Sequence, residues 1–242
     1  MSRMNEMKKA STISCTVCQS TEHQAFISTD TMMHPKNSNR FYFRKCQVCD
    51  SVFLSNPVTE SELSKYYGKS YLPYQGAAAW GKFASIVDDS QQKVDAKRLT
   101  VLKNVMKGTD NFSLLDVGCG KPSFLQLVQQ KLQVDCNGID FTDQGWKNGH
   151  YRGLKLQQNS LADFQPKQSY DAITLWHYLE HDYHLQATVE KLYECLKPGG
   201  KLIFEVPDYQ SLSAKSQKQF WQGWHSPRHL SLFAPKSFKL LF

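Results

Sequence analysis

Four cysteines form two pairs with the spacing of a metal site. The pairs are Cys15-x-x-Cys18 and Cys46-x-x-Cys49, with 27 residues between them. Two such pairs match a tetrahedral zinc site of four thiolates, although the usual interval is about 15 to 20 residues. The alternative is two pairs of unligated thiols. We expect zinc, bound by Cys15, Cys18, Cys46 and Cys49.

The expected zinc ion has a structural role, because four cysteines fill all four positions and leave none for a substrate. His23 and His34 lie between the pairs, and either could replace a thiolate, but we expect both to remain unligated. A segment of about 40 residues buries too little surface to fold alone. A structural zinc ion supplies roughly 10 to 16 kcal/mol of apparent binding energy, so it decides whether residues 15–57 fold.

A second chemical motif is an apolar stretch that runs into two glycines. Residues 114–120 read L-L-D-V-G-C-G, and Pro122 and a helix predicted from Ser123 follow. Glycines let the backbone approach a ligand, and a helix amino terminus offers N–H groups to a carboxylate or phosphate. Twenty residues beyond Gly120, Asp140 ends the next predicted strand. In doubly wound nucleotide-binding folds an acid at this place binds ribose hydroxyls.

Two kinds of nucleotide site compete for this loop. A dinucleotide site requires G-x-G-x-x-G, and Gly118, Gly120 and Ser123 satisfy two of its three positions. The D-V-G-C-G sequence at residues 116–120 resembles instead the first motif of class I S-adenosylmethionine-dependent methyltransferases. The later L-K-P-G-G at residues 196–200 resembles the turn before strand five in that family. We therefore favour the methyltransferase.

The resemblance covers roughly residues 114–206 and implies S-adenosylmethionine as the cofactor. It places residues 159–161 in the loop on the adenine side. The family usually has a third glycine where this chain has Pro122; proline suits the first helical position but lacks the N–H that would meet the methionine carboxylate. The cofactor-binding residues that the resemblance implies are Asp116, Gly118, Gly120, Asp140, Ser160, Leu161 and Trp176.

Polar side chains follow the strand predicted at residues 172–176. Residues 171–181 read D-A-I-T-L-W-H-Y-L-E-H, and open α/β sheets bind ligands at the carboxyl ends of their strands. The segment resembles the L-E-H segment of methyltransferases for small polar or lipid-linked substrates, a group that includes sugar methyltransferases with cysteine-rich amino-terminal modules. We predict catalytic roles for His177, Glu180 and His181. Either histidine could be a general base, since imidazole titrates near pH 6.5, or could instead cap a helix or pack beside the cofactor.

Residues 227–230 read P-R-H-L and are followed by Phe233, and this segment resembles a second signature of the same group. It implies that Arg228 and His229 bind the substrate. The planar guanidinium of Arg228 could pair with a phosphate or carboxylate of the substrate, or with an acid of a nearby loop.

The elements that must position these residues alternate between strand and helix patterns. Strands are predicted at residues 113–117, 136–139, 154–158, 172–176 and 201–206, with helices at 123–131, near 143 and at 185–196. Such alternation is typical of βαβ units around a parallel sheet. We predict an α/β fold with a Rossmann-like, doubly wound, mostly parallel sheet, in which Asp116 and Asp140 end adjacent strands.

The sequence before and after this sheet defines the other regions. Short strands are predicted at residues 41–43 and 52–54, a helix start at 59–67 and a helix at 87–106. We expect a disordered tail at 1–14, a zinc-binding module at 15–57, a helical linker region at 58–108 and the methyltransferase domain at 109–242. After residue 206 only residues 229–233 resemble a strand, whereas the family's sheet ends in an antiparallel pair. We therefore expect a truncated sheet with an uncovered edge.

Bulk composition excludes several classes of protein. Of the 242 residues 40% are hydrophobic and 21% charged, which is typical of globular proteins. No apolar run suits a signal peptide or reaches the roughly 20 residues that span a bilayer, so we expect a cytoplasmic protein. In that reducing compartment Cys-x-x-Cys pairs indicate metal ligands. The net charge of +7 is scattered without a dense basic tract, which disfavours nucleic-acid binding.

The resemblance therefore implies an enzyme that transfers a methyl group to a small polar acceptor, such as a sugar, a sugar nucleotide or a lipid-linked molecule. Two alternatives remain open. One is a non-catalytic binding protein with a degenerate methyltransferase domain, and the other is an RNA methyltransferase guided by the zinc module. The acceptor and the oligomeric state do not follow from the sequence.

Overall fold

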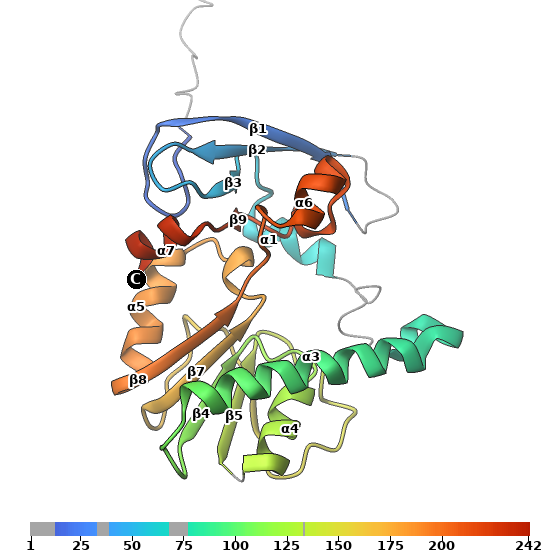
Figure 1. The fold of residues 1–242 in the computed structure, drawn as a ribbon, viewed down its shortest axis with the longest axis vertical. Helices are drawn as coiled ribbons and strands as arrows, with labels where there is room; N and C mark the ends of the chain where they lie inside the picture. Colours follow the sequence, from blue (N-terminus) through green and yellow to red (C-terminus); the bar gives the residue numbers. More distant parts are fainter. Residues whose placement is uncertain (1–12, 33–38, 68–76, 133) are drawn as a thin grey trace, which may run out of the picture. The chain divides into compact units, whose positions relative to one another are not determined.

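The chain is divided into two compact units in the computed structural model, which describes residues 13–32, 39–67, 77–132 and 134–242. The sheet unit is Thr59–Pro207, and the cysteine unit combines Met1–Val58 with Asp208–Phe242 (Figure 1). These bounds differ from the expected ones in two respects. Residues 59–108 cluster with the parallel sheet, and residues 208–242 cluster with the amino-terminal segment.

The sheet unit contains five parallel strands in the order β6-β5-β4-β7-β8. This order confirms the predicted Rossmann-like, doubly wound fold. β4 pairs with β5 on one side and β7 on the other, so the strand order reverses there. Asp116 is opposite Gly138, which confirms that Asp116 and Asp140 are on adjacent strands. The strands are β4 Ser113–Val117, β5 Asp135–Asp140, β6 Lys155–Gln158, β7 Tyr170–Trp176 and β8 Leu196–Glu205.

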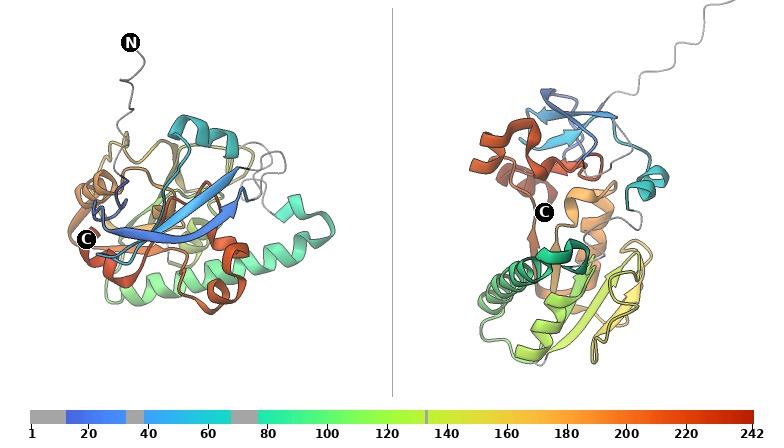
Figure 2. Two further views of the ribbon diagram at one scale, coloured as in Figure 1. Left: turned by 90° about the horizontal axis from the view of Figure 1, so that it is seen from above. Right: turned by 90° about the vertical axis from the view of Figure 1, so that its right-hand side faces the viewer.

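Helices cover the sheet because its central strands are apolar on both faces. α3 (Ala84–Val105) and α4 (Ser123–Leu132) lie side by side and pack Leu102 and Leu125 into one core with Leu114 of β4 (Figure 1, Figure 2). α5 (Leu185–Cys195) connects β7 to β8 on the other side of β4. Right-handed crossovers that run in opposite directions from β4 place α4 and α5 on opposite faces.

Short elements of the sheet unit agree with the sequence prediction only at residues 59–67. α1 (Glu60–Leu63) and η1 (Ser64–Tyr67) form the predicted helix start, η2 (Ala77–Phe83) precedes α3, and η3 (Leu179–His181) follows β7. The helix predicted near residue 143 is absent, and turns take its place. Gly145 lies so close to the carbonyl of Gly120 that no side chain would fit, and glycine itself disfavours a helix.

The cysteine unit is built on a small antiparallel sheet in the order β1-β2-β3-β9. β1 (His23–Asp30) was not predicted, whereas β2 (Arg40–Cys46) and β3 (Val52–Leu54) confirm the two strands expected beside the second cysteine pair. β9 (Ser231–Leu232) pairs with β3, with Phe53 opposite Ser231. The strand expected at residues 229–233 therefore belongs to this sheet and not to the parallel one, whose two edge strands among the described residues are β6 and β8.

Residues 208–242 add apolar side chains to the core of the cysteine unit. Trp224 packs against Phe43 and Phe26, with ring centroids 5.0 and 6.1 Å apart. Tyr209 donates a hydrogen bond of 2.6 Å to the carbonyl of Asp50. So short an amino-terminal segment cannot bury a sufficient core, which is the physical reason for this arrangement. The segment contains α6 (Leu212–Gln217), η4 (Lys218–Phe220), η5 (Gln222–Trp224) and α7 (Pro235–Leu241).

Within the described residues, none of the helices combines the length and the apolar character that crossing a bilayer requires.

Replacing Leu232 by alanine tests the role of β9, because Leu232 is fully buried. We expect a loss of about 2 to 5 kcal/mol in the unfolding free energy of the cysteine unit, with faster exchange of the Leu54 amide, which donates to Leu230. Leu212→Ala is the matched control, since Leu212 is 85% exposed in the same segment and should change stability by about 0.5 kcal/mol at most. Denaturant unfolding combined with amide exchange measures both, and equal effects would contradict the assignment.

Candidate functional site

The glycine loop joins β4 to α4 at the carboxyl end of the parallel sheet. Gly118 and Gly120 have φ angles of 72° and 47°, in the region that favours glycine. The N–H groups of Gly118 and Cys119 both donate to the carbonyl of Ile139, at 2.8 and 3.0 Å. A Cβ atom at Gly118 would be 2.7 Å from the ring of Tyr178, whereas one at Gly120 would meet nothing within 4 Å. The loop is therefore closely packed at Gly118 and open at Gly120.

Asp140 ends β5, and its carboxylate is bound to the glycine loop. The N–H of Gly120 donates to Oδ2 at 3.0 Å, and the N–H of Thr142 donates to Oδ1 at 3.1 Å. Burial raises the pKa of Asp140, although these hydrogen bonds act in the opposite direction. The structure thus places this acid directly beside Gly120, and its contact with a ribose stays a prediction.

Asp116 lies within the sheet, beneath the glycine loop. It is 2% exposed, and the Thr174 hydroxyl on β7 donates to its Oδ1 at 2.6 Å. Burial raises the pKa of Asp116 to about 7, with the hydrogen bond from Thr174 acting against it. Asp116 therefore links β4 to β7, and a direct contact with the cofactor stays a prediction.

The loop after β6 lies next to the end of β5, because the N–H of Asn159 donates to the carbonyl of Asp140 at 2.8 Å. In this loop the Ser160 hydroxyl accepts a backbone N–H at 3.1 Å, and Leu161 is buried. Phe141 directly follows Asp140 and is 57% exposed. Sequence reasoning missed Phe141, although an aromatic residue directly after the strand-end acid was a usable signal.

Trp176 ends β7 and packs between two helices. Its ring meets Phe124 of α4 edge-on, with centroids 5.1 Å apart, and the guanidinium of Arg98 lies 4.8 Å from its ring centroid. The indole Nε1 is buried and has no hydrogen-bond partner in the described part of the chain. An unsatisfied buried donor is uncommon and is consistent with a ligand group that would accept from it.

His177 directly follows β7 and contacts two carboxylates. Its Nδ1 is 3.0 Å from Glu180 Oε1, and its Nε2 is 2.8 Å from Glu205 Oε1. Since ionised carboxylates only accept hydrogen bonds, both ring nitrogens donate and the ring is an imidazolium. Burial opposes this charge, but the two carboxylates raise the pKa of His177 from 6.5 to about 9. A ring that is already protonated at neutral pH does not suit a general base.

Arg98 of α3 forms a salt bridge with Glu205, the second carboxylate in contact with His177. Its Nη2 is 2.8 Å from Glu205 Oε1, and its Nη1 is 3.9 Å from Asp95 Oδ1 on the same helix. The hydrogen bond from His177, together with Arg98, lowers the pKa of Glu205 to about 2, against the effect of burial. Sequence reasoning named neither Arg98 nor Glu205. The end of the last predicted strand was the usable signal, because Trp176 and Glu205 are paired across β7 and β8.

Glu180 and His181 lie in η3, which begins two residues after His177. Glu180 is fully buried, and its Oε2 has no hydrogen-bond partner among the described residues. A ring nitrogen of His181 lies within 4.8 Å of a Glu180 carboxylate oxygen. The three residues predicted to be catalytic are therefore close to one another at the carboxyl end of β7.

Arg228 and His229 lie in the cysteine unit. Arg228 is 1% exposed, its Nη2 donates to the Met32 carbonyl at 3.1 Å, and the same atom is 2.7 Å from His225 Nε2. Nδ1 of His229 donates to the carbonyl of Gly223 at 2.7 Å. Both side chains thus have partners within their own unit, and substrate binding by them stays a prediction.

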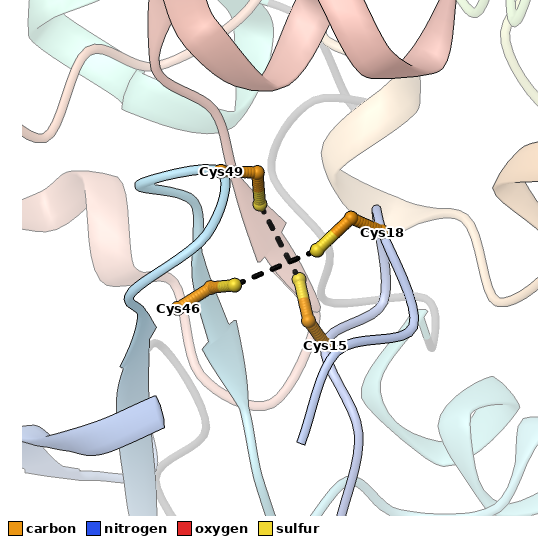
Figure 3. A group of neighbouring side chains, drawn as sticks. All are labelled: Cys15, Cys18, Cys46 and Cys49. Atoms are coloured by element: carbon orange, nitrogen blue, oxygen red, sulfur yellow. Dashed lines mark hydrogen bonds between the residues drawn. The ribbon is translucent and has the colours of Figure 1, made fainter. Parts of the chain in front are cut away.

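The four cysteine sulfurs point toward one centre, as Figure 3 shows. Cys15 Sγ is 3.6 Å from Cys49 Sγ, and Cys18 Sγ is 3.5 Å from Cys46 Sγ. All four sulfurs lie within 4.8 Å of one another. A tetrahedron with metal–sulfur bonds of 2.3 Å has sulfurs about 3.8 Å apart. The cluster therefore has the dimensions of a zinc site.

The two cysteine pairs also sit in matching turns. Gln19 and Asp50, which directly follow the second cysteine of each pair, both have a left-handed backbone, with φ angles of 60° and 62°. In the first turn the N–H of Val17 donates to Cys15 Sγ at 3.4 Å. Backbone N–H groups directed at sulfur favour the thiolate form, which is the form that binds metals. Two equivalent turns thus present two sulfurs each.

Comparison with known proteins identifies the fold. The family model described as a methyltransferase domain matches residues 86–242. The ubiquinone biosynthesis O-methyltransferase of Idiomarina loihiensis is 28% identical over 153 residues, which are 60% of this chain and 60% of that protein. The chain thus spans about 60% of the length of that curated relative.

Solved structures resemble the chain at lower identity. The N-methyltransferase NodS from Bradyrhizobium japonicum WM9 is 17% identical with a TM-score of 0.44, over 61% of this chain and 80% of that one. The plantazolicin methyltransferase BpumL, solved with S-adenosylhomocysteine, is 16% identical with a TM-score of 0.48, over 75% of this chain and 67% of that one.

The resemblance inferred from residues 116–120 is thereby confirmed. The family model covers more than half of the chain and includes the glycine loop, Asp140 and the parallel sheet that carries them. The chain belongs to the methyltransferase domain family.

Proposed function

We propose that this chain transfers a methyl group from S-adenosylmethionine to a hydroxyl group of a small polar acceptor. The observation that carries the proposal is the hydrogen bond of 3.0 Å from Gly120 to Asp140. It brings the open glycine loop and the strand-end acid together at the point where the strand order reverses. In open α/β sheets this is the place where nucleotides bind.

The residues around this point fit S-adenosylmethionine. The open space over Gly120 and the N–H groups at the start of α4 suit the methionine carboxylate, and Asp140 suits the ribose hydroxyls. Phe141, which is 57% exposed, offers apolar surface to the adenine ring, and Leu161 is buried in the loop after β6. Bound there, the cofactor supplies an electrophilic methyl group on a sulfonium ion.

The proposed acceptor carries a hydroxyl group because the curated relative is named an O-methyltransferase. A sugar, a sugar nucleotide or a lipid-linked molecule also agrees with the L-E-H segment. His181 would accept the hydroxyl proton of the acceptor, since His177 is already an imidazolium and cannot take it. Glu180 is close enough to His181 to stabilise the positive charge that His181 gains.

Replacing Asp140 by alanine should weaken cofactor binding at least a hundredfold. Each hydrogen bond to a charged group contributes about 1.5 to 3 kcal/mol, and about 1.4 kcal/mol corresponds to a factor of ten in affinity. Two ribose hydroxyls would lose their acceptor. Calorimetric titration with S-adenosylhomocysteine, the demethylated product, measures the change.

The matched control is Asp135→Ala, at the first position of the same strand. Asp135 pairs with Lys155 at 2.8 Å, at the opposite end of β5 from the glycine loop, so this variant should bind like the unaltered chain. Equal affinity of the Asp140 variant would remove Asp140 from the site. Failure of the unaltered chain to bind S-adenosylhomocysteine or S-adenosylmethionine would contradict the proposal and favour the non-catalytic alternative.

We also propose that Cys15, Cys18, Cys46 and Cys49 bind one zinc ion with a structural role. The sulfur spacing and the two matching turns support it. Four protein ligands leave no open position, so the ion would stabilise the fold and take no part in methyl transfer.

Replacing Cys18 by alanine should abolish the stoichiometric zinc content of the purified, reduced protein. It should also make the cysteine unit sensitive to proteases, since metal binding supplies much of the folding free energy of such small modules. Cys195→Ala is the control, because Cys195 is a buried free cysteine of the sheet unit and should leave the zinc content near one ion per chain. Plasma emission spectrometry measures the metal, and unaltered protein without zinc would contradict the assignment.

A further inference from the structure

We propose that Glu205 and Arg98 are positioning residues of the active site: Arg98 orients Glu205, Glu205 holds His177 as an imidazolium, and this imidazolium fixes the carboxylate of Glu180. The inference rests on the proposed function, because the orientation of Glu180 matters only in a catalytic site. It assigns roles to two residues that no sequence motif identifies.

The first step is the position of Glu205 between two cations. Its Oε1 is 2.8 Å from Nη2 of Arg98 and 2.8 Å from Nε2 of His177. Its Oε2 is 3.5 Å from Nε of Arg98, so the guanidinium approaches both carboxylate oxygens. A guanidinium remains charged at any physiological pH, and a carboxylate beside it stays ionised. Glu205 is thus a permanent acceptor for His177.

The second step is the dependence of Glu180 on His177. Glu180 is 0% exposed, and a buried carboxylate is costly unless a cation and hydrogen bonds compensate for lost water. Nδ1 of His177 supplies both to Oε1 at 3.0 Å. Oε2 has no hydrogen-bond partner among the described residues, so the bond to His177 sets the direction in which this free oxygen points.

The backbone of His177 shows that this arrangement is imposed from outside the turn. Its φ angle is 58°, a left-handed conformation that residues other than glycine seldom adopt. Such a conformation persists only where surrounding contacts enforce it. The contacts are the two carboxylates on its ring and the hydrogen bond of 2.9 Å from its N–H to the carbonyl of Glu205.

The charged groups around the ring come from three elements. Glu180 is in η3, Glu205 ends β8, and Arg98 and Asp95 are on α3. The two carboxylates in contact with the ring hold its pKa at about 9. The imidazolium is therefore present at neutral pH and is lost as the pH rises above about 9.

Replacing Glu205 by glutamine tests the proposal on the full chain without cofactor or acceptor. Nitrogen-15 NMR of the imidazoles, with the His177 signals assigned from His177→Gln, should show a midpoint near pH 9 in the unaltered chain. In the variant we expect it to fall by at least one pH unit, because one carboxylate is lost. Exchange protection of the His181 amide, which donates to the Tyr178 carbonyl at 3.0 Å, should fall at least tenfold while β5 amides keep theirs.

Two further variants make the outcome specific. Glu190→Gln, on the exposed face of α5, is the matched control and should change neither measurement. Arg98→Met keeps apolar contact with Trp176 but releases Glu205, so the His181 amide should lose protection although the His177 midpoint does not fall. The proposal would be overturned if Glu205→Gln left the His177 midpoint unchanged. It would also be overturned if neither Glu205→Gln nor Arg98→Met changed the exchange protection of the His181 amide.

The test of the positioning network can be distinguished from the test of the proposed function. Titration with S-adenosylhomocysteine of the same unaltered protein reports on the cofactor site alone. Binding together with unchanged NMR and exchange in the Glu205 variant would refute only the positioning network. Shifted NMR and exchange without any binding would leave the network standing and refute the methyltransferase.

Discussion

The parallel pairing of β4 with both β5 and β7 is the constraint on which the site depends. Parallel strands end at the same edge of a sheet, so the three segments that follow them are brought together. Gly120, Asp140 and His177 follow or end these three strands. Because helices cover both faces, polar groups inside the sheet must bond to one another, as Thr174 does to Asp116. At the carboxyl edge of the sheet the strand ends and the loops that follow them bring polar groups together.

The charged groups at this edge differ in how strongly their surroundings fix their ionisation state. Burial raises the pKa of Asp116 and Asp140, which acts against their charged forms, while Arg98 and His177 hold Glu205 ionised. His177 therefore belongs to an ion-pair network with Glu180 and Glu205. His181 is the proton acceptor in the proposed mechanism.

Local patterns predicted the sheet well, because its central strands β4 and β7 are short apolar runs with clear ends. β4 was predicted with its bounds, and the glycine loop and Asp140 were placed on adjacent strands from spacing alone. Glu205 and Arg98 were missed because their pairing depends on register across β7 and β8 and on how α3 packs. Neither is a property of any short window of sequence. The turns near residue 143 were mistaken for a helix because the approach of Gly145 to Gly120 is also a tertiary contact.

The clustering of residues 208–242 with the amino-terminal segment could not be predicted for a related reason. A two-residue strand carries almost no periodic signal, so β9 gave no indication of which sheet it would join. Its pairing with β3 closes a loop that contains the whole sheet unit. The entropy cost of closing a loop rises only slowly with its length, so one compact domain can be inserted in another at modest cost. The two cysteine pairs lie before this insertion and close a much shorter loop. All four ligands of the proposed metal site therefore come from the amino-terminal segment, whereas the core around Trp224 and Leu232 includes the last residues of the chain.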